Sequence, residues 1–208
     1  MTTQALDDVM HRAPVIPVIV IDDAADAVPI AEALVRGGLP VLEVTLRTPA
    51  ALAAMQAMAQ VPGALVGAGT VLDVGQLQAA VQAGARFLVS PGYSANVDAA
   101  ARAASIPWLP GTATAGEVMR AREAGCQRLK FFPAEQAGGA EMLKAFGSVF
   151  RDVVFCPTGG ITLAKAPQYL ALDNVACVGG SWVLPKALVA QRDWAAIERL
   201  AAEAAALR

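Results

Sequence analysis

The feature that most constrains this chain of 208 residues is a repeat of short apolar runs, rich in β-branched residues, that alternate with longer Ala- and Leu-rich segments. The longer segments carry charges at helical spacing, so the alternation predicts strand–helix units. Successive runs start 21 to 27 residues apart, which leaves room for one strand, one helix and two short loops. The predicted strands are 14–21, 41–46, 64–71, 86–92, 107–113, 128–133, 153–160 and 175–182.

Eight such units in unbroken series favour an α/β fold of one particular kind, a closed (β/α)8 TIM barrel. We expect a single barrel domain over residues 1–208, with a short N-terminal helix before the first strand. An open, doubly wound sheet is the alternative. It is disfavoured because no G-x-G-x-x-G turn follows the first strand and the strands show no reversal point.

Helix ends are marked by residues that cap helices. The expected N-cap oxygens are those of Asp73, Ser94 and Thr114, and the expected left-handed C-cap residues are Gly37, Gly84 and Gly125.

Composition excludes several classes of protein. Hydrophobic residues make up 56%, charged residues 16%, and the mean hydropathy is +0.49, so disorder is excluded. The net charge of -2, without a run of Lys or Arg, speaks against a nucleic-acid partner. The apolar runs are shorter than the ~20 residues that span a bilayer, and Asp7 and Asp8 do not fit a secretory signal. We expect a soluble cytoplasmic protein without a membrane partner.

Neither a metal nor a cofactor is expected. Cys126, Cys156 and Cys177 lie far apart without C-x-x-C spacing, so we expect buried, reduced thiols. The one histidine, His11, precedes the first strand in a helical segment, which speaks against a His-rich metal site and a histidine base.

Strand 41–46 breaks the rule that buried parallel strands are continuously apolar. Its period of two places Glu43, Thr45 and Arg47 on one face, opposite the apolar residues that must meet the helices. The polar face therefore points into the barrel, towards the C-terminal mouth where such folds carry their active sites. A purely structural Glu43–Arg47 ion pair is the alternative, and it is disfavoured because buried ion pairs stabilise folds weakly.

Lys130 is the second charged residue inside an apolar strand. It stands between Leu129 and Phe131, whereas the other three lysines fall in helical or post-strand segments, where they are usually solvated. Burial favours the neutral amine, which can attack a ketone. The alternative is a lysine whose ammonium reaches out of the barrel mouth into water.

Glycine pairs end the seventh and eighth predicted strands. Gly159 and Gly160 follow one strand, and Gly179 and Gly180 precede Ser181 at the end of the other. Backbone N–H groups of these loops form the phosphate cradle of many (β/α)8 barrels, so we expect a phosphate site rather than simple tight turns.

Six motifs follow one another in the order of a known family. They are LEVTLRTP at 42–49, GAGTV at 67–71, SPG at 90–92, LKFFPAE at 129–135, PTGGI at 157–161 and GGSW at 179–182. Through almost the whole chain the sequence resembles the KDPG aldolases, the Schiff-base aldolases of 2-dehydro-3-deoxy-6-phosphogluconate and 4-hydroxy-2-oxoglutarate. The sequence departs from the family at Asp22–Asp23 after the first strand, where relatives often carry basic or other polar residues, so whether this loop contacts the substrate stays open.

The resemblance implies a homotrimer of (β/α)8 barrels that binds a phosphorylated 2-keto sugar acid and pyruvate. It implies that Lys130 forms the Schiff base and that Glu43 is the general acid/base. For substrate binding it implies Arg47 and Thr70 at the pyruvyl carboxylate, Gly159, Gly160 and Ser181 at the phosphate, and Phe132 and Pro91 in the wall. The arginine at 47 and the Pro-Thr-Gly-Gly form favour the gluconate over the galactonate substrate.

Three other functions fit parts of the pattern. In a phosphate-binding isomerase or epimerase Glu43 would abstract a proton and Lys130 would only neutralise charge. A metal-dependent aldolase is disfavoured by the single histidine. A non-catalytic sugar-phosphate sensor leaves the inward lysine and glutamate without a purpose.

Overall fold

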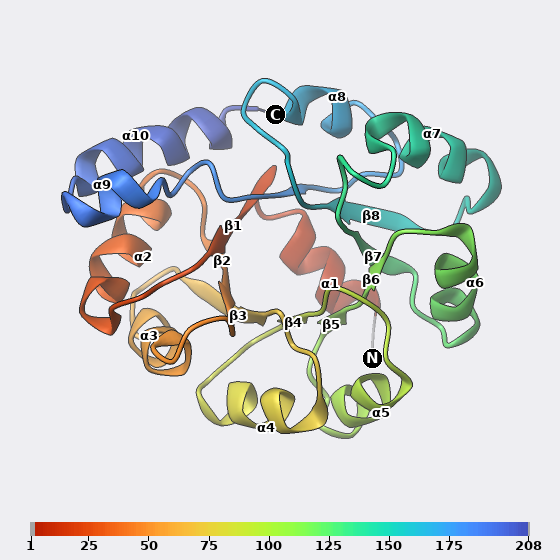
Figure 1. The fold of residues 1–208 in the computed structure, drawn as a ribbon, viewed down its shortest axis with the longest axis horizontal. Helices are drawn as coiled ribbons and strands as arrows, with labels where there is room; N and C mark the ends of the chain where they lie inside the picture. Colours follow the sequence, from red (N-terminus) through yellow and green to blue (C-terminus); the bar gives the residue numbers. More distant parts are fainter. Residues whose placement is uncertain (1–2, 208) are drawn as a thin grey trace.

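The structure, a computed structural model, describes residues 3–207 and shows parallel strands surrounded by helices (Figure 1). The strands are β1 Val15–Ile19, β2 Val41–Thr45, β3 Leu65–Gly69, β4 Leu88–Val89, β5 Trp108–Leu109, β6 Gly111–Thr112, β7 Arg128–Phe131, β8 Val154–Pro157 and β9 Val178–Gly180. The helices are α1 Thr3–Met10, η1 Ala24–Asp26, α2 Ala27–Arg36, α3 Ala51–Met58, α4 Val74–Gln82, α5 Ala95–Ala103, α6 Ala115–Glu123, α7 Gly139–Val149, α8 Ala166–Leu170, α9 Lys186–Ala190 and α10 Trp194–Ala205.

The strands form a curled parallel arrangement in two sheets. One has the order β5-β4-β3-β2-β1-β9 and the other the order β6-β7-β8. Single parallel bridges, Phe155 to Val175 and Thr158 to Gly179, connect the β8 segment with the β9 segment. The prediction of an α/β fold with parallel strands is confirmed, and each predicted strand range contains a strand.

The fifth predicted strand is divided, because β5 and β6 are separated by Pro110. Proline lacks the N–H that a strand residue donates to its neighbour. The carbonyl oxygen of Pro110 still accepts a hydrogen bond from the N–H of Lys130, at 2.8 Å. This hydrogen bond places Pro110, the residue between the two short strands, beside β7.

Helix α1 packs against residues near the beginnings of several strands. Its Leu6, Val9 and Met10 are buried in a cluster that includes Ile16 and Val41. Asp7 binds Arg128, the first residue of β7, with 2.9 Å between Nη2 and Oδ2. The N-terminal helix thus fastens the strand that carries Lys130. Within residues 3–207, helices of the length and apolarity needed to span a membrane are absent.

The three predicted N-caps are confirmed. Asp73 accepts a hydrogen bond from the N–H of Gln76, and Ser94 accepts one from Val97. Thr114 and Glu117 form a reciprocal capping box, in which N–H groups of Ala113 and then Thr114 lower the pKa of Glu117. Because this pKa is depressed, the stabilisation is complete above the ordinary glutamate pKa and is lost as the pH falls through the folded value.

Of the three predicted C-cap glycines, two are confirmed and one is wrong. Gly84 and Gly125 have φ of 90° and 85°. Gly37 has φ of -74°, and its neighbour Gly38 takes the left-handed conformation with φ of 89°. Gly37 is required for a different reason, because a Cβ there would lie 2.4 Å from the Cβ of Ala201 on α10.

The thiols differ in burial. Cys156 and Cys177 are buried, and Cys126 is half-buried. Burial raises the pKa of the Cys126 thiol to about 11, so this group stays protonated at neutral pH.

The capping box gives a first prediction. Thr114→Ala removes the side-chain acceptor of the Glu117 N–H, so we expect the free energy of unfolding to fall by about 1 kcal/mol at pH 7. Urea unfolding measures this loss, and Thr114→Ser, which keeps the hydroxyl, is the matched control. An alanine variant as stable as the wild type would contradict this account of α6.

Candidate active site

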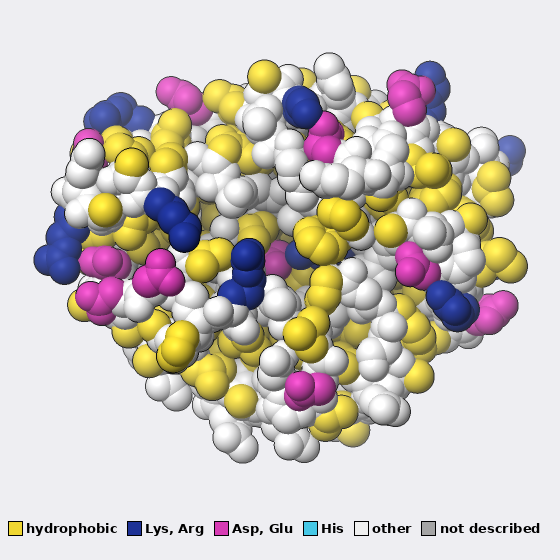
Figure 2. Space-filling view, in the orientation of Figure 1, with side chains coloured by type: hydrophobic (Ala, Val, Ile, Leu, Met, Phe, Trp, Pro, Cys, Tyr) yellow, Lys and Arg dark blue, Asp and Glu magenta, His cyan; other side chains and the backbone are white. Residues whose placement is uncertain are grey.

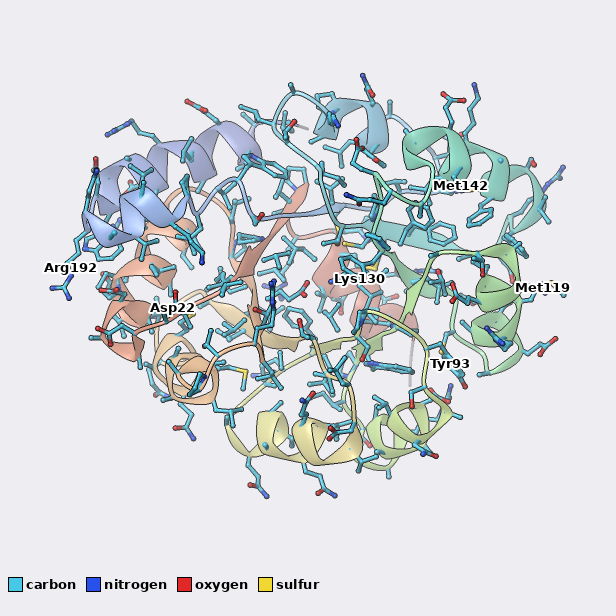
Figure 3. All side chains as sticks on the ribbon, in the orientation of Figure 1. Asp22, Tyr93, Met119, Lys130, Met142 and Arg192 are labelled. Carbon is cyan, nitrogen blue, oxygen red and sulfur yellow. The ribbon has the colours of Figure 1, made fainter. Side chains whose placement is uncertain are left out.

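Lys130 lies on β7 between the neighbouring strands β6 and β8, where it pairs with Gly111 and Cys156. It is only 5% exposed. Its Nζ donates a hydrogen bond to Oε1 of Glu43, at 3.1 Å. Figure 3 shows Lys130 near the centre of the ring of helices. The alternative of an ammonium reaching into water is therefore wrong.

Glu43 lies on β2 and is 3% exposed, as the period of two predicts. Its carboxylate occupies space that a side chain on β3 would fill, because a Cβ on Gly69 would lie 2.3 Å from Oε1. Gly67 likewise gives room to the ring of Phe87. The Gly67–Ala68–Gly69 segment thus admits neighbouring side chains.

The two charges form a buried ion pair. In the described part of the chain, the partner of Glu43 is Lys130, so a Glu43–Arg47 pair is not what forms here. A proton can move from the ammonium to the carboxylate without changing the net charge of the pair. The result is a neutral amine beside a carboxylic acid, which is a nucleophile beside a proton donor.

Arg47 does not continue the alternation of β2. The strand ends at Thr45, and the N–H of Arg47 bonds back to the carbonyl of Thr45 in a turn. Thr45 itself is buried, and its hydroxyl donates to the carbonyl of Ile19 at 2.9 Å. The guanidinium of Arg47 is consequently at the surface, beside a cavity, rather than between the strands.

This cavity has a volume of about 470 Å³ and brings five of the nine predicted site residues together. These are Arg47, Phe132, Gly159, Gly160 and Ser181. Gly179, from the second glycine pair of the expected phosphate site, also lines it. The remaining lining residues had no predicted role: Val18, Val20, Thr158, Ile161, Leu184, Pro185 and Lys186. Figure 2 shows acidic and basic side chains near the centre of the face that it draws.

Phe132 connects the cavity with the ion pair. It lines the cavity, and the centroid of its ring lies 5.4 Å from Nζ of Lys130. Lys130 and Glu43 themselves are outside the residues that line the cavity. Phe132 therefore lies between the cavity and the buried ion pair.

Thr70 and Pro91 also lie outside the cavity lining. Thr70 directly follows Gly69, the glycine against Glu43, and has φ of 58°, which is a strained backbone for a β-branched residue. A Cβ on Gly111 would lie 2.2 Å from the carbonyl of Pro91, so the Pro91 loop packs on the strand next to Lys130. Both residues are thus close neighbours of the elements that hold the ion pair.

The loop after β8 has the backbone that glycine alone adopts easily. Gly159 and Gly160 have φ of 109° and 76°. Beside them the hydroxyl of Thr158 is buried without a hydrogen-bond partner among the described residues. Among the same residues, clusters of three or more His, Cys, Asp or Glu side chains that could hold a metal are absent.

Two of the missed residues left some signal in the sequence. Thr158 is the one hydroxyl of the Pro-Thr-Gly-Gly motif, at the end of a buried strand. Lys186 is exposed, as expected for a post-strand lysine. It nevertheless lines the same cavity as Arg47, although the two residues lie far apart in the sequence. Its position depends on the path of the loop after β9, and the hydrophobic periodicity of a sequence does not predict the paths of loops.

Comparison with known proteins agrees with this geometry. The family model for KDPG and KHG aldolase matches residues 6–200. A 2-dehydro-3-deoxy-phosphogluconate aldolase of Zymomonas mobilis is 55% identical over 203 residues, 98% of this chain and 96% of the relative.

Two solved structures are similar over nearly their full length. The Zymomonas mobilis aldolase with 3-phosphoglycerate is 54% identical, with a TM-score of 0.96 and coverage of 100% and 98% of the two chains. The KDPG aldolase of Legionella pneumophila, with pyruvate captured as a covalent carbinolamine, is 47% identical, with a TM-score of 0.94 and coverage of 96% and 98%. With this extent of similarity in sequence and fold, the chain belongs to the KDPG and KHG aldolase family.

Proposed function

We propose that this chain is a Schiff-base aldolase that reversibly cleaves 2-dehydro-3-deoxy-6-phosphogluconate to pyruvate and glyceraldehyde 3-phosphate. We propose that it also acts on 4-hydroxy-2-oxoglutarate, in keeping with the name of its family. The observation that carries the proposal is the buried Lys130 amine, 3.1 Å from the carboxylate of Glu43 and next to a cavity. The carbinolamine of the Legionella pneumophila relative is the expected first adduct of such an amine with pyruvate.

The first steps use the proton that the ion pair shares. Lys130 passes a proton to Glu43, and the neutral amine attacks the C2 ketone to give a carbinolamine. Glu43 returns the proton as the C2 oxygen leaves as water, so a positively charged iminium forms on Lys130. The carboxylate of Glu43 is then free to act as a base.

Carbon–carbon cleavage follows from the charge of the iminium. Glu43 removes the proton of the C4 hydroxyl, the C3–C4 bond breaks, and its electron pair moves to the iminium nitrogen. Glyceraldehyde 3-phosphate leaves, and a neutral enamine remains on Lys130. Glu43 protonates C3, and water then hydrolyses the iminium to release pyruvate and restore the ion pair. The iminium is the electron sink, so these steps require no metal.

The cavity residues suggest how the substrate is held. Arg47 offers a guanidinium for the carboxylate of the pyruvyl part, and we assign Thr70 to the same end. The backbone at Gly159 and Gly160, together with Ser181, suits the phosphate at the other end. Phe132 and Pro91 would border the path between the two ends.

We further propose that the two sheets belong to one closed (β/α)8 barrel, a single domain over residues 1–208. The bridges between the β8 and β9 segments and the short gap at Pro110 support this. We propose a homotrimer as well. Exposed apolar side chains support it, such as Met119 on α6 and Met142 on α7, which lie on the same side of the molecule in Figure 3. The cytoplasmic location stays a prediction.

Reductive trapping tests the covalent step. With pyruvate and borohydride, we expect one stable adduct, mapped to Lys130 by peptide mass spectrometry, together with loss of aldolase activity. Lys144→Arg, at an exposed lysine on α7, is the control and should be trapped like the wild type. An adduct on another lysine, or full activity in Lys130→Ala, would overturn the assignment, and an isomerase would show no adduct.

The role of Glu43 is tested by Glu43→Gln, which keeps size and burial but cannot exchange protons as a carboxylate does. We expect kcat for cleavage to fall by ~10²-fold or more. A coupled assay of pyruvate release measures this change. Near-normal turnover in this variant would remove Glu43 from the proton-transfer steps.

A further inference from the structure

Glu135, in the turn after β7, contacts both ends of the loop that carries Gly159 and Gly160. At the first end, its N–H donates to the carbonyl of Gly159 at 3.1 Å. At the other end, its carboxylate accepts hydrogen bonds from Nζ of Lys165, just before α8, and from the hydroxyl of Tyr169 within α8. One residue therefore fastens the loop where it leaves β8 and where it enters the next helix.

The side chain of Glu135 also packs directly on the loop. A Cβ on Gly160 would lie 2.8 Å from Cγ of Glu135 and 3.0 Å from its Cβ. The methylene groups thus occupy the place that a side chain at position 160 would need. Gly160 has φ of 76°, and Gly159 has φ of 109°. Glycine adopts many other conformations as easily, so these two residues keep this backbone only where neighbouring contacts hold it.

The negative charge of Glu135 is balanced by the neighbouring ammonium of Lys165. Hydrogen bonds from Lys165, the larger cause, and from Tyr169 lower the pKa of this carboxyl. Burial, and then the hydrogen bond to Glu135, raise the pKa of Tyr169. The carboxylate is thus ionised and paired at neutral pH. A bare carboxylate beside glycine amides would repel a phosphate dianion, and the pairing with Lys165 reduces that repulsion.

We propose that Glu135 is a positioning residue that holds the backbone of residues 158–160 in its anion-binding form and so sets the preference for phosphorylated substrates. It touches the loop rather than the reacting atoms. This inference rests on the proposed function, because it assigns the phosphate of the substrate to the loop after β8. It adds that the strength of phosphate recognition depends on a carboxylate outside the cavity lining.

The test compares two substrates that differ only in the phosphate, 2-dehydro-3-deoxy-6-phosphogluconate and 2-dehydro-3-deoxygluconate. In Glu135→Ala we expect kcat/KM for the phosphorylated substrate to fall roughly 10-fold, mainly through KM, since charged hydrogen bonds are lost. For the unphosphorylated substrate we expect a change within about 2-fold. Glu135→Gln keeps the methylenes and one acceptor, so it should restore part of the loss.

Two further variants complete the design. Tyr169→Phe removes one hydrogen bond to the carboxylate and should shift the substrate ratio in the same direction as Glu135→Ala, but less. Glu123→Ala, at an exposed glutamate that ends α6, makes the same charge change on a different helix and should leave both substrates unaffected. If Glu135→Ala fails to fold, the glutamine and phenylalanine variants carry the test.

The outcomes separate the two proposals. A wild-type chain that releases no pyruvate from either substrate overturns the proposed function, and this inference with it. An active wild type with an unchanged substrate ratio in the Glu135 and Tyr169 variants overturns the inference alone. Equal losses on both substrates, or tighter binding of the phosphorylated substrate in Glu135→Gln, also overturn it, because they indicate general damage or simple charge repulsion.

Discussion

The structure depends on the contact between the amine of Lys130 and the carboxylate of Glu43, two charges that are almost fully withdrawn from water. Removing such ions from water costs several kcal/mol each, and their mutual attraction offsets this only in good geometry. The residues lie 87 positions apart, so the contact requires strands β2 and β7 to face each other across the curled sheets. It also requires Gly69, because any side chain there would displace the carboxylate. The fold thus fixes the position of an ion pair whose burial costs free energy.

The same pair explains why one carboxylate can serve at every step of the proposed reaction. Each step moves a single proton between Glu43 and a group on the substrate or on Lys130, and the net charge of the buried pair returns to zero after each turnover. In the proposed function, the cavity beyond Phe132 supplies the rest of the recognition, with Arg47 and the glycine loop as the proposed anion sites. Under this proposal, chemistry and binding are carried by different elements, β2 and β7 for the first and the loops for the second.

Local patterns predicted the strands, the N-caps and the two inward-facing charged residues, because each of these features depends on a few neighbouring residues in the sequence. A charge in an apolar strand is such a feature, and both Lys130 and Glu43 were found by it. Their partnership could not be predicted from the residues alone, since it depends on strand register over the whole chain. Arg47 was placed on the strand because alternation continues past Thr45, whereas the backbone turns there. Lys186 and Thr158 were missed because loop paths decide which side chains line a cavity.

The most direct measurement is a crystal structure of this chain soaked with pyruvate. The account predicts continuous electron density from Nζ of Lys130 to C2 of pyruvate, with Glu43 within hydrogen-bond distance of the new bond and the pyruvate carboxylate towards Arg47. Pyruvate bound without a covalent link, or joined to another lysine while Lys130 and Glu43 stay paired, would contradict it.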